Sequence, residues 1–361
     1  TGLGRYTESM VSQLHRLKPP LNIYLLVSQD RQAQIKSRLP RFKIIPCGSR
    51  HYSLSEQLEI PQLINKLKPD LTHFLHFNVP LRLTSKYVVT IHDLTKHHSK
   101  GVNTTTKSPI FYPLKRFGYH LTINHAIKES QLILTPSNWV KQDILRFYSV
   151  PQEKIIVTPE AAAKIYLSQR IKPSVHNLYK YSYLIYVGNA YPHKNVLQLI
   201  KAAQKFNLIN QKKIKLVIIT PRNIFYERLR HQIRLLKAQS TVKLKDFTSD
   251  SRLKLLYRHS VAFITASLFE GFGLPGLEAM ASQTLVLSSN RASLPEVYGS
   301  AAIYFNPENL DEMIDKINYA LNLDKIKRQA LIAKAYLHAK QFSWEKTAKL
   351  TLNAYQKVLN S

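Results

Sequence analysis

The chain has 361 residues, enough for two ordinary domains, because single hydrophobic cores seldom grow beyond about 250 to 300 residues. Its composition, 44% hydrophobic with 10 Gly and 18 Pro, excludes a disordered or fibrous protein. A formal net charge of +30 makes nucleic acid, anionic lipid and phosphorylated small molecules candidate partners, and charge alone does not choose among them.

Cysteine usage and hydropathy narrow the class further. Cys47 is the only cysteine, which excludes an internal disulfide and any zinc or iron–sulfur site built from cysteines. No apolar run approaches the roughly 18 residues of a membrane span, and the first residues lack the charged-then-apolar order of a signal peptide. We therefore expect a cytoplasmic protein that does not cross a membrane.

Short β-branched and aromatic runs alternate with longer amphipathic runs, which is the pattern of parallel sheets covered by helices. In the first half of the chain the predicted strands are 22–28, 42–45, 71–76, 87–93, 132–137 and 155–160. In the second half they are 183–188, 214–220, 242–247, 261–267, 284–288 and 301–305. The sequence therefore predicts the α/β class, with two similar units in series.

Breaks in this pattern predict the domain boundaries. Residues 1–165 form the expected first domain, 166–181 a linker without periodicity, and 182–342 a second domain. The segment 343–361 reads as a helix with Ser343 as its N-cap, and we expect it to pack back on the first domain. Ligands of such proteins bind in a cleft outside the carboxyl ends of the strands.

The amino terminus departs from a doubly wound pattern. Gly2 and Gly4 predict a glycine-rich turn that leads into a helix, with no strand before it. Because the first strand of a doubly wound sheet is central, we expect the natural chain to begin earlier, and the loss of that strand to expose sheet edges.

Residues 270–278, Glu-Gly-Phe-Gly-Leu-Pro-Gly-Leu-Glu, are the most informative segment, because they follow a predicted strand and enter a helix. Pro275 fits a first helical turn, and the glycines let backbone amides approach a ligand closely. A helix amino terminus binds phosphate, and Glu270 and Glu278 flank it with carboxylates suited to sugar hydroxyls. The alternative is a surface glycine loop with two solvated glutamates.

This segment resembles the E-x7-E motif of the retaining glycosyltransferases of family 4, which have the GT-B fold of two Rossmann-like domains facing a cleft. Residues 90–94 (Thr-Ile-His-Asp-Leu) resemble the T-x-H-D loop of that family, and 134–137 (Leu-Thr-Pro-Ser) resemble its V-T-x-S strand end. Residues 186–195 resemble its Y-V-G-x-x-x-P-H-K-N segment. The match extends, in the order of the family, from Gly2 to about Asn306.

The resemblance implies transfer of a hexose, with mannose suggested by the P-H-K-N type, from a nucleotide diphosphate sugar to a glycan or lipid-linked acceptor. It implies that His92 and Glu270 are catalytic, that Glu278 contacts the ribose and that Lys194 neutralises the diphosphate. The implied donor-binding set is Gly2, Gly4, Gly188, Lys194, Gly271, Phe272, Gly273, Leu274 and Glu278. No D-x-D pair occurs, in agreement with metal-independent relatives, so neither a metal nor a cofactor is expected.

Two positions beside these motifs leave alternatives open. Asp93 either orients His92 or caps the next turn. Asn189 stands where many relatives carry arginine, so Lys194 is the clearer cation. Arg222 either compensates or is one of the many other basic residues.

Basic and aromatic residues interleave over 107–120, a mixture that suits a helix lying on anionic lipid at the inner face of the membrane. The alternative is a helix whose aromatic side chains pack in the first domain while its cations are solvated. Pro113 argues against one unbroken helix in this segment.

Two further function classes remain at this point. A nucleic-acid-binding protein is supported only by the charge, because the sequence contains no zinc-finger spacing, helix-turn-helix pattern or RNA-binding aromatic motif. An inactive relative that binds a sugar nucleotide without turnover would keep the same motifs.

Overall fold

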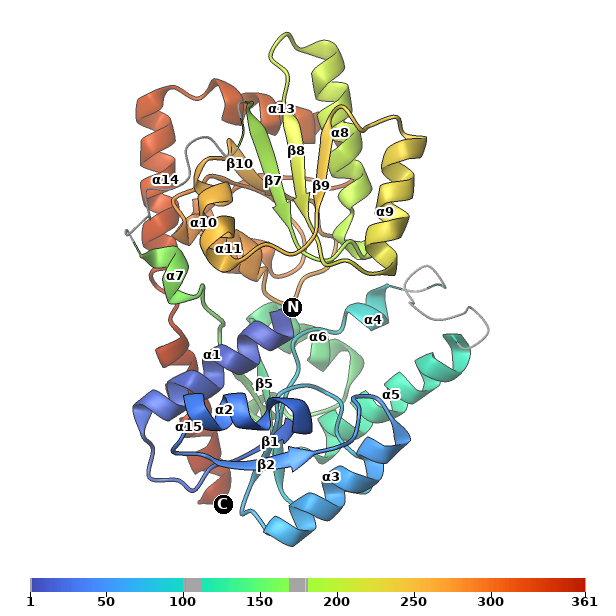
Figure 1. Ribbon diagram of the computed structural model, residues 1–361, viewed down its shortest axis with the longest axis vertical. Helices are drawn as coiled ribbons and strands as arrows, with labels where there is room; N and C mark the ends of the chain where they lie inside the picture. Colours follow the sequence, from blue (N-terminus) through green and yellow to red (C-terminus); the bar gives the residue numbers. More distant parts are fainter. Residues whose placement is uncertain (1, 100, 102–111, 169–178, 180, 361) are drawn as a thin grey trace. The chain divides into compact units, whose positions relative to one another are not determined.

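The computed structural model describes residues 2–99, 101, 112–168, 179 and 181–360. The chain divides into two compact units, drawn in Figure 1 and each considered by itself. The first unit comprises Thr1–His92, Ile110–Pro159 and Trp344–Ser361, and the second comprises Asp93–Pro109 and Glu160–Ser343.

The unit boundaries differ in detail from the predicted ones. The second unit begins at Glu160, before the predicted boundary at 165, because Ala162 and Tyr166 pack into its core. It also includes the segment that starts at Asp93, where the His98 ring stacks on Phe269 with centroids 4.5 Å apart. Most of the predicted linker, 169–178 and 180, lies outside the described residues.

All twelve strands predicted from the sequence are present, with ends that differ by a few residues. In the first unit they are β1 (Tyr24–Ser28), β2 (Lys43–Cys47), β3 (Thr72–Phe74), β4 (Tyr87–Thr90), β5 (Leu132–Thr135) and β6 (Ile155–Val157). In the second they are β7 (Tyr183–Val187), β8 (Lys215–Ile219), β9 (Val242–Lys245), β10 (Ala262–Thr265), β11 (Val286–Ser289) and β12 (Ile303–Phe305). Most predicted strands end a few residues later than the observed strands. The residues after the observed ends do not pair with a neighbouring strand.

In the first unit the described strands form two separate parallel sheets, β1-β2 and β3-β4-β5-β6. Every residue of β4 and β5 is buried, as expected of strands covered on both faces, whereas the residues of β1 and β2 are half-buried or exposed. The core of this unit therefore lies around β4 and β5.

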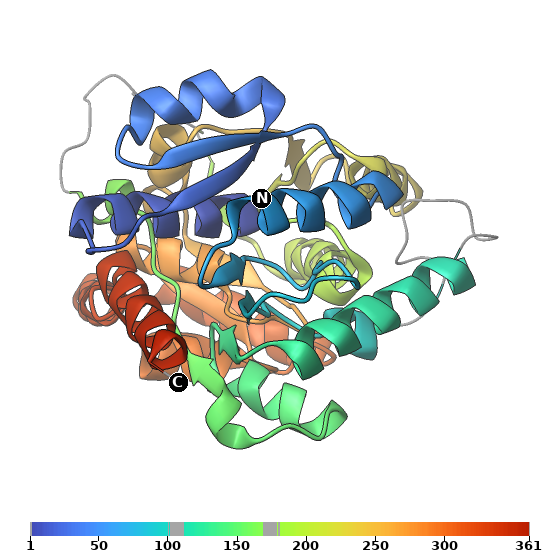
Figure 2. The ribbon, with the colours of Figure 1, turned by 90° about the horizontal axis from the view of Figure 1, so that it is seen from below.

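Helices cover the sheets of the first unit. They are α1 (Gly2–Leu17), α2 (Gln32–Arg38), α3 (Leu54–Leu67), α5 (Tyr112–Glu129), α6 (Asn138–Phe147) and α15 (Trp344–Leu359), with the short 3-10 turns η1 (Gln29–Arg31) and η4 (Gln152–Lys154). The carboxyl-terminal helix α15, red in Figure 2, packs against α1 and β5, and it places Ala354 and Val358 against Leu132 and Leu134.

The prediction about the first helix is wrong. Helix α1 begins at Gly2, so Gly2 and Gly4 are exposed residues of its first turn rather than a turn before it. Its buried face, Tyr6, Met10 and Leu14, follows the helical period from this first turn onward. Helix α5 begins at Tyr112, with Pro113 in its first turn, where proline is tolerated. That 107–120 is not one unbroken helix stays a prediction. The preceding residues, 107–111, lie outside the described residues.

The second unit is built on one parallel sheet with the strand order β12-β11-β10-β7-β8-β9. The chain starts at the central strand β7, adds β8 and β9 on one side, and then returns to add β10, β11 and β12 on the other. This is a doubly wound sheet, and the order reverses between β7 and β10, the position where such sheets bind ligands.

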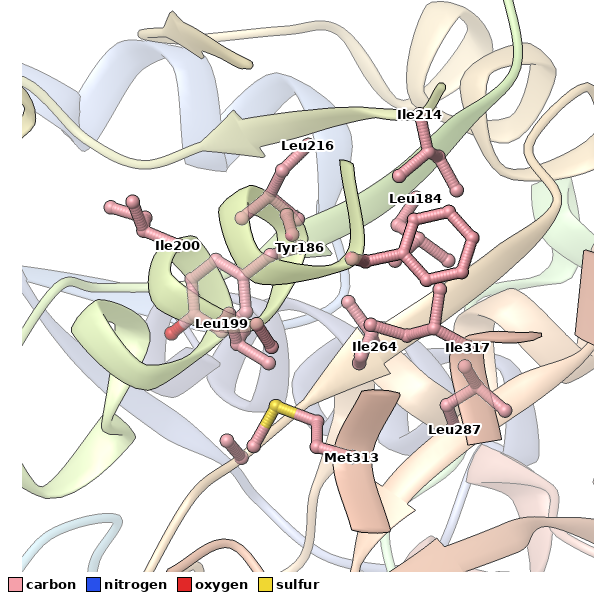
Figure 3. Packing of buried hydrophobic residues seen from close by; sticks show 14 of the residues in the cluster. Leu184, Tyr186, Leu199, Ile200, Ile214, Leu216, Ile264, Leu287, Met313 and Ile317 are labelled. Carbon is pink, nitrogen blue, oxygen red and sulfur yellow. The ribbon is translucent and has the colours of Figure 1, made fainter. Parts of the chain in front are cut away.

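Side chains of this sheet alternate between two hydrophobic layers. Leu184, Tyr186 and Ile264 face a layer formed with α8 (Val196–Ile209), α9 (Ile224–Leu235) and α13 (Leu310–Asn322), shown in Figure 3. Tyr183 and Ile185 face the opposite layer. That layer includes α7 (Lys164–Leu167), α10 (Asp250–Arg258), α11 (Leu274–Ala281), α12 (Leu294–Tyr298) and α14 (Lys325–Ala339). The remaining short elements are α4 (Thr95–His98), η5 (Pro192–Lys194) and η6 (Gly299–Ala301).

A histidine inside the first unit links four of its elements. The ring nitrogens of His73 on β3 lie 2.6 Å from the Tyr355 hydroxyl of α15 and 2.8 Å from the Thr90 hydroxyl of β4. Thr90 in turn lies 3.2 Å from the hydroxyl of Tyr6 on α1. Desolvation, helped by the nearby His92, lowers the pKa of His73 to about 3, so the ring is neutral.

This neutral histidine predicts that acid destabilises the first unit. Between pH 6.5 and about 3 the unfolded state binds a proton at His73 that the folded state does not. The free energy of unfolding should therefore fall with decreasing pH in this window, by at most about 1.4 kcal/mol per pH unit from this residue. Urea unfolding of wild type and His73→Gln at pH 7 and pH 5 should show the wild type losing more stability than the variant.

A matched control is His231→Gln, at an exposed position of α9. Its stability should follow the wild type in parallel across the same pH range. Parallel curves for His73→Gln and wild type would contradict a buried neutral His73.

Candidate functional site

Two loops meet at the carboxyl edge of the second unit's sheet, where the strand order reverses. One follows β7 and contains Gly188 and η5, and the other follows β10 and leads through Glu270 into α11. The backbone amide of Leu268 donates to the carbonyl of His193 at 2.8 Å, so a hydrogen bond holds the two loops together.

The centre of this edge is an ion pair between the two loops. The Lys194 ammonium lies 2.6 Å from Oε2 of Glu270, and the two side chains are only 18% and 17% exposed. The other carboxylate oxygen of Glu270, Oε1, accepts a hydrogen bond from the Ser267 hydroxyl at 2.9 Å. Because the pair is shielded from water, its charges interact more strongly than those of an exposed pair.

Neutral and charged groups surround this ion pair. Desolvation and the neighbouring Lys194 lower the pKa of His193 to about 4, against the opposing attraction of Glu270 and Asp93, so its imidazole is neutral. Burial raises the pKa of Tyr186 well above its ordinary value, and its hydroxyl donates to the carbonyl of Asn189 at 2.7 Å. The loop after β7 is thus fixed by a tyrosine that stays protonated.

The glycines after Glu270 are required by the close packing of the loop. Gly273 has a φ of 91°, and a Cβ there would lie 2.5 Å from Leu294 and 2.6 Å from the Tyr298 hydroxyl. A Cβ at Gly276 would lie 2.2 Å from the same hydroxyl. These positions exclude side chains, and they bring the first turn of α11 close against the tyrosine.

Helix α11 begins directly after Gly273, with Pro275 in its first turn, as the sequence predicted. The amides of a first helical turn have no partner within their helix, and the helix dipole adds partial positive charge there. Lys194, paired with Glu270 just before this turn, places an ammonium group in the same region. The arrangement is suited to binding a phosphate group.

The other predicted donor residues of this segment are largely buried. Phe272, Leu274 and Glu278 are 5%, 7% and 3% exposed, and the first two belong to the hydrophobic layer that contains α11. Phe272 and Leu274 therefore offer a ligand their backbone rather than their side chains. Gly188 follows β7 directly, and Gly271 lies in the buried loop.

His92 lies in the first unit, just after β4, whereas Glu270 belongs to the second. Its Nε2 donates to the carbonyl of Leu75 at 3.0 Å, and the Tyr6 ring meets its imidazole edge-on at 4.5 Å. Asp93 accepts a hydrogen bond from the amide of Thr95 at 2.8 Å, so it caps the turn that follows.

Charge and hydrogen bonds settle the ionisation of Asp93. Desolvation raises its pKa, but the hydrogen bonds from Thr95 and the electrostatic interactions with His193 and the Lys194 ammonium outweigh this effect. The pKa of Asp93 is therefore below its ordinary value, and the side chain is an anion at neutral pH.

Sequence reasoning missed several residues that shape this site. Ser267 holds the Glu270 carboxylate, Ser293 donates to the backbone carbonyl of Glu270 at 2.9 Å, and Tyr298 donates to the carbonyl of Gly273 at 2.5 Å. Serines and tyrosines outside a motif carry no signal of such roles. His193 is different, because it lies inside the 186–195 motif, so the sequence could have identified it as a site residue.

A shallow cavity of about 520 Å³ lies at the same carboxyl edge, where β9 ends and α10 begins. Its lining includes Tyr226, Lys245 and Phe247, and Phe247 is 87% exposed. An exposed aromatic ring beside a cation is suited to stacking against a flat ligand group. No motif of the sequence indicated this cavity.

Within the described ranges, no three His, Cys, Asp or Glu side chains lie together as candidate metal ligands. Across the same part of the chain, no helix combines the length and the apolar composition that a membrane span requires.

Two family models match nearly the whole chain. The model described as "Glycosyltransferase Family 4" matches residues 1–162, and that described as "Glycosyl transferases group 1" matches residues 168–338. The chain is 27% identical to "O-antigen chain mannosyltransferase B" of Escherichia coli, over 99% of this chain and 96% of that protein. It is 28% identical to "O-antigen chain mannosyltransferase RfbU" of Salmonella typhimurium, over 73% and 78% respectively.

Solved structures share the fold. A glycosyltransferase from Rickettsia africae matches with a TM-score of 0.73 and 19% identity, over 98% of this chain and 94% of that chain. Sucrose-phosphate synthase from Thermosynechococcus elongatus matches with a TM-score of 0.78 and 14% identity, over 100% and 94%. The GT-B fold class predicted from the sequence is confirmed by these matches and by the parallel sheets of both units.

Proposed function

The chain belongs to family 4 of the glycosyltransferases, and we propose that this glycosyltransferase moves a hexose from a nucleotide diphosphate sugar to a glycan or glycolipid acceptor, with the anomeric configuration retained. Mannose is the first candidate for the hexose, because the two O-antigen relatives are named mannosyltransferases. No metal or cofactor is part of the proposal.

The observation that carries the proposal is the Lys194–Glu270 pair beside the start of α11, at the reversal point of a doubly wound sheet. A diphosphate bound to the first amides of α11 would lie next to the Lys194 ammonium. As the glycosidic bond breaks, negative charge grows on the diphosphate, and a fixed cation stabilises that charge without a metal.

The proposed roles of the two carboxylates follow from their positions. Glu270 is held by Ser267 and Lys194, so its carboxylate is oriented before a sugar arrives, and it accepts hydrogen bonds from hexose hydroxyls. Glu278 is largely buried. It accepts hydrogen bonds from the ribose through the part of its carboxylate that a ligand can reach. His92 is proposed as the second catalytic group.

The cavity at the end of β9 provides a place for the nucleobase. Phe247 and Tyr226 offer aromatic faces on the same edge of the sheet as the phosphate-binding turn. A base stacked there would give the donor a second point of attachment, which would fix the direction of the diphosphate.

Substitutions test these assignments. Glu270→Gln removes the carboxylate and Lys194→Met removes the ammonium, and each should lower the transfer rate by about 100- to 1,000-fold, as loss of one preorganised charge does in other enzymes. His92→Ala should also lower the rate. The measurement is release of nucleoside diphosphate from candidate nucleotide sugars, with GDP-mannose tried first.

Glu308→Gln is the matched control, because it breaks an exposed ion pair of the same unit, Arg291–Glu308, at 2.9 Å. It should leave the rate unchanged. Equal activity of wild type, Glu270→Gln and Lys194→Met would remove both residues from the mechanism. Binding without transfer would favour an inactive relative, and salt-sensitive polynucleotide binding with no heat from any nucleoside diphosphate would favour the nucleic-acid class.

We also propose that the first unit binds the surface of an anionic membrane through α5. Leu114, Phe117 and Leu121 lie on one face of this helix and are 70%, 66% and 45% exposed. The opposite face carries Tyr119 and Ile123, which are buried, so the helix is apolar on both sides. An exposed apolar stripe on a chain with a charge of +30 is suited to a surface of anionic lipid.

Sedimentation with vesicles tests this surface. Phe117→Ser should reduce binding to vesicles that contain phosphatidylglycerol, because it removes apolar area that enters the lipid. The control is Leu208→Ser, at an 83% exposed position of α8, and it should bind like the wild type. Wild-type binding should weaken as salt is added, and binding that is independent of salt would contradict the proposal.

A further inference from the structure

Loop 270–276 of the second unit is hydrogen-bonded to Ser293 and Tyr298, at the two ends of α12. No motif of the sequence indicated this segment. We propose that Tyr298, together with Ser293, is a positioning residue that holds loop 270–276 in the shape that binds diphosphate. This inference rests on the proposed function, because it assigns a role within that donor site.

The first observation is how Tyr298 holds the loop. Its hydroxyl donates to the carbonyl oxygen of Gly273 at 2.5 Å, and its side chain is buried at 1% exposure. Across a trans peptide bond the carbonyl and the following N–H point in opposite directions. Because the Gly273 carbonyl is held toward Tyr298 in the core, the Leu274 amide is turned away from the core, where a phosphate could accept its hydrogen bond.

The second observation is that the same segment holds the other end of the loop. Ser293, the residue before α12, is fully buried and its hydroxyl donates to the carbonyl of Glu270 at 2.9 Å. By the same geometry this contact fixes the Glu270–Gly271 peptide plane. Ser293 and Tyr298 thus hold two peptide planes of one loop, and they reach it from the two ends of α12.

The third observation is the fit between Tyr298 and the glycines. The hydroxyl reaches the loop only because positions 273 and 276 carry no side chain, since a Cβ at either would lie within 2.6 Å of it. A Cβ at Gly276 would also lie 2.4 Å from the ring carbon Cζ of Tyr298. The glycines therefore make room for both the ring and the hydroxyl, and the hydroxyl adds a hydrogen bond that a phenylalanine could not make.

The ionisation of Tyr298 agrees with a permanent donor. Burial is the main cause that raises its pKa well above the ordinary value, and the nearby carboxylates of Glu270 and Glu278 add to the shift. The phenol therefore stays protonated at neutral pH and keeps its hydrogen bond to Gly273.

The test compares two tyrosine-to-phenylalanine variants of the same unit. Tyr298→Phe removes the hydrogen bond to Gly273 and keeps the ring. Tyr304→Phe removes a similar hydrogen bond, from a phenol to the carbonyl of Gly299 at 2.6 Å, in which no atom of loop 270–276 takes part. GDP and UDP are titrated into the wild type and both variants by calorimetry, and melting temperatures are measured for all three.

We expect Tyr298→Phe to weaken binding of the preferred diphosphate about tenfold, and Tyr304→Phe to leave it unchanged, while both lower the melting temperature by similar amounts. A purely structural role for Tyr298 would change the melting temperature and leave the affinity of the folded protein intact. With an active donor, the KM of Tyr298→Phe should rise more than its kcat falls.

The outcomes separate this inference from the proposed function. If the wild type binds a diphosphate and Tyr298→Phe binds it equally well, the inference fails and the proposed function stands. If the wild type binds neither diphosphate, both fail. Should Tyr298→Phe not fold, Ser293→Ala removes the other support of the loop, and unchanged affinity in that variant would overturn the inference.

Discussion

The ion pair between Lys194 and Glu270 depends on one topological constraint. A doubly wound sheet reverses its strand order once, so the loops after β7 and β10, distant in sequence, leave the same edge side by side. The cation comes from one loop and the carboxylate from the other. Because both are shielded from water, each orients its partner, and the edge holds opposite charges ready for a ligand that carries both phosphate and hydroxyl groups.

Rigid support around this pair distinguishes it from an ordinary surface ion pair. Ser267 fixes the carboxylate, while Ser293 and Tyr298 fix the backbone of the loop that carries it. Glycine at positions 273 and 276 leaves the space that the contact with Tyr298 needs. Backbone amides that are held in place need no reorganisation when charge develops on a ligand, which is the condition under which such groups contribute most to catalysis.

The sequence predicted those features of the fold that follow from local patterns. Alternating apolar runs located all twelve strands, and Pro275 with its glycines located the start of α11. It failed at the amino terminus, because Gly2 and Gly4 join a helix whose buried face begins at Tyr6. The supports of the site were also invisible, since hydrogen bonds to backbone carbonyls come from tertiary packing and leave no spacing in the sequence.

In the proposed donor site, backbone amides of loop 270–276 bind the diphosphate of the donor. Hydrogen–deuterium exchange, with and without a nucleoside diphosphate, reports on those amides directly. An amide that donates a hydrogen bond to a bound phosphate exchanges its hydrogen more slowly. We expect slower exchange at Gly273 and Leu274 when the diphosphate is bound. Unchanged exchange there, with protection appearing only in other parts of the chain, would contradict it.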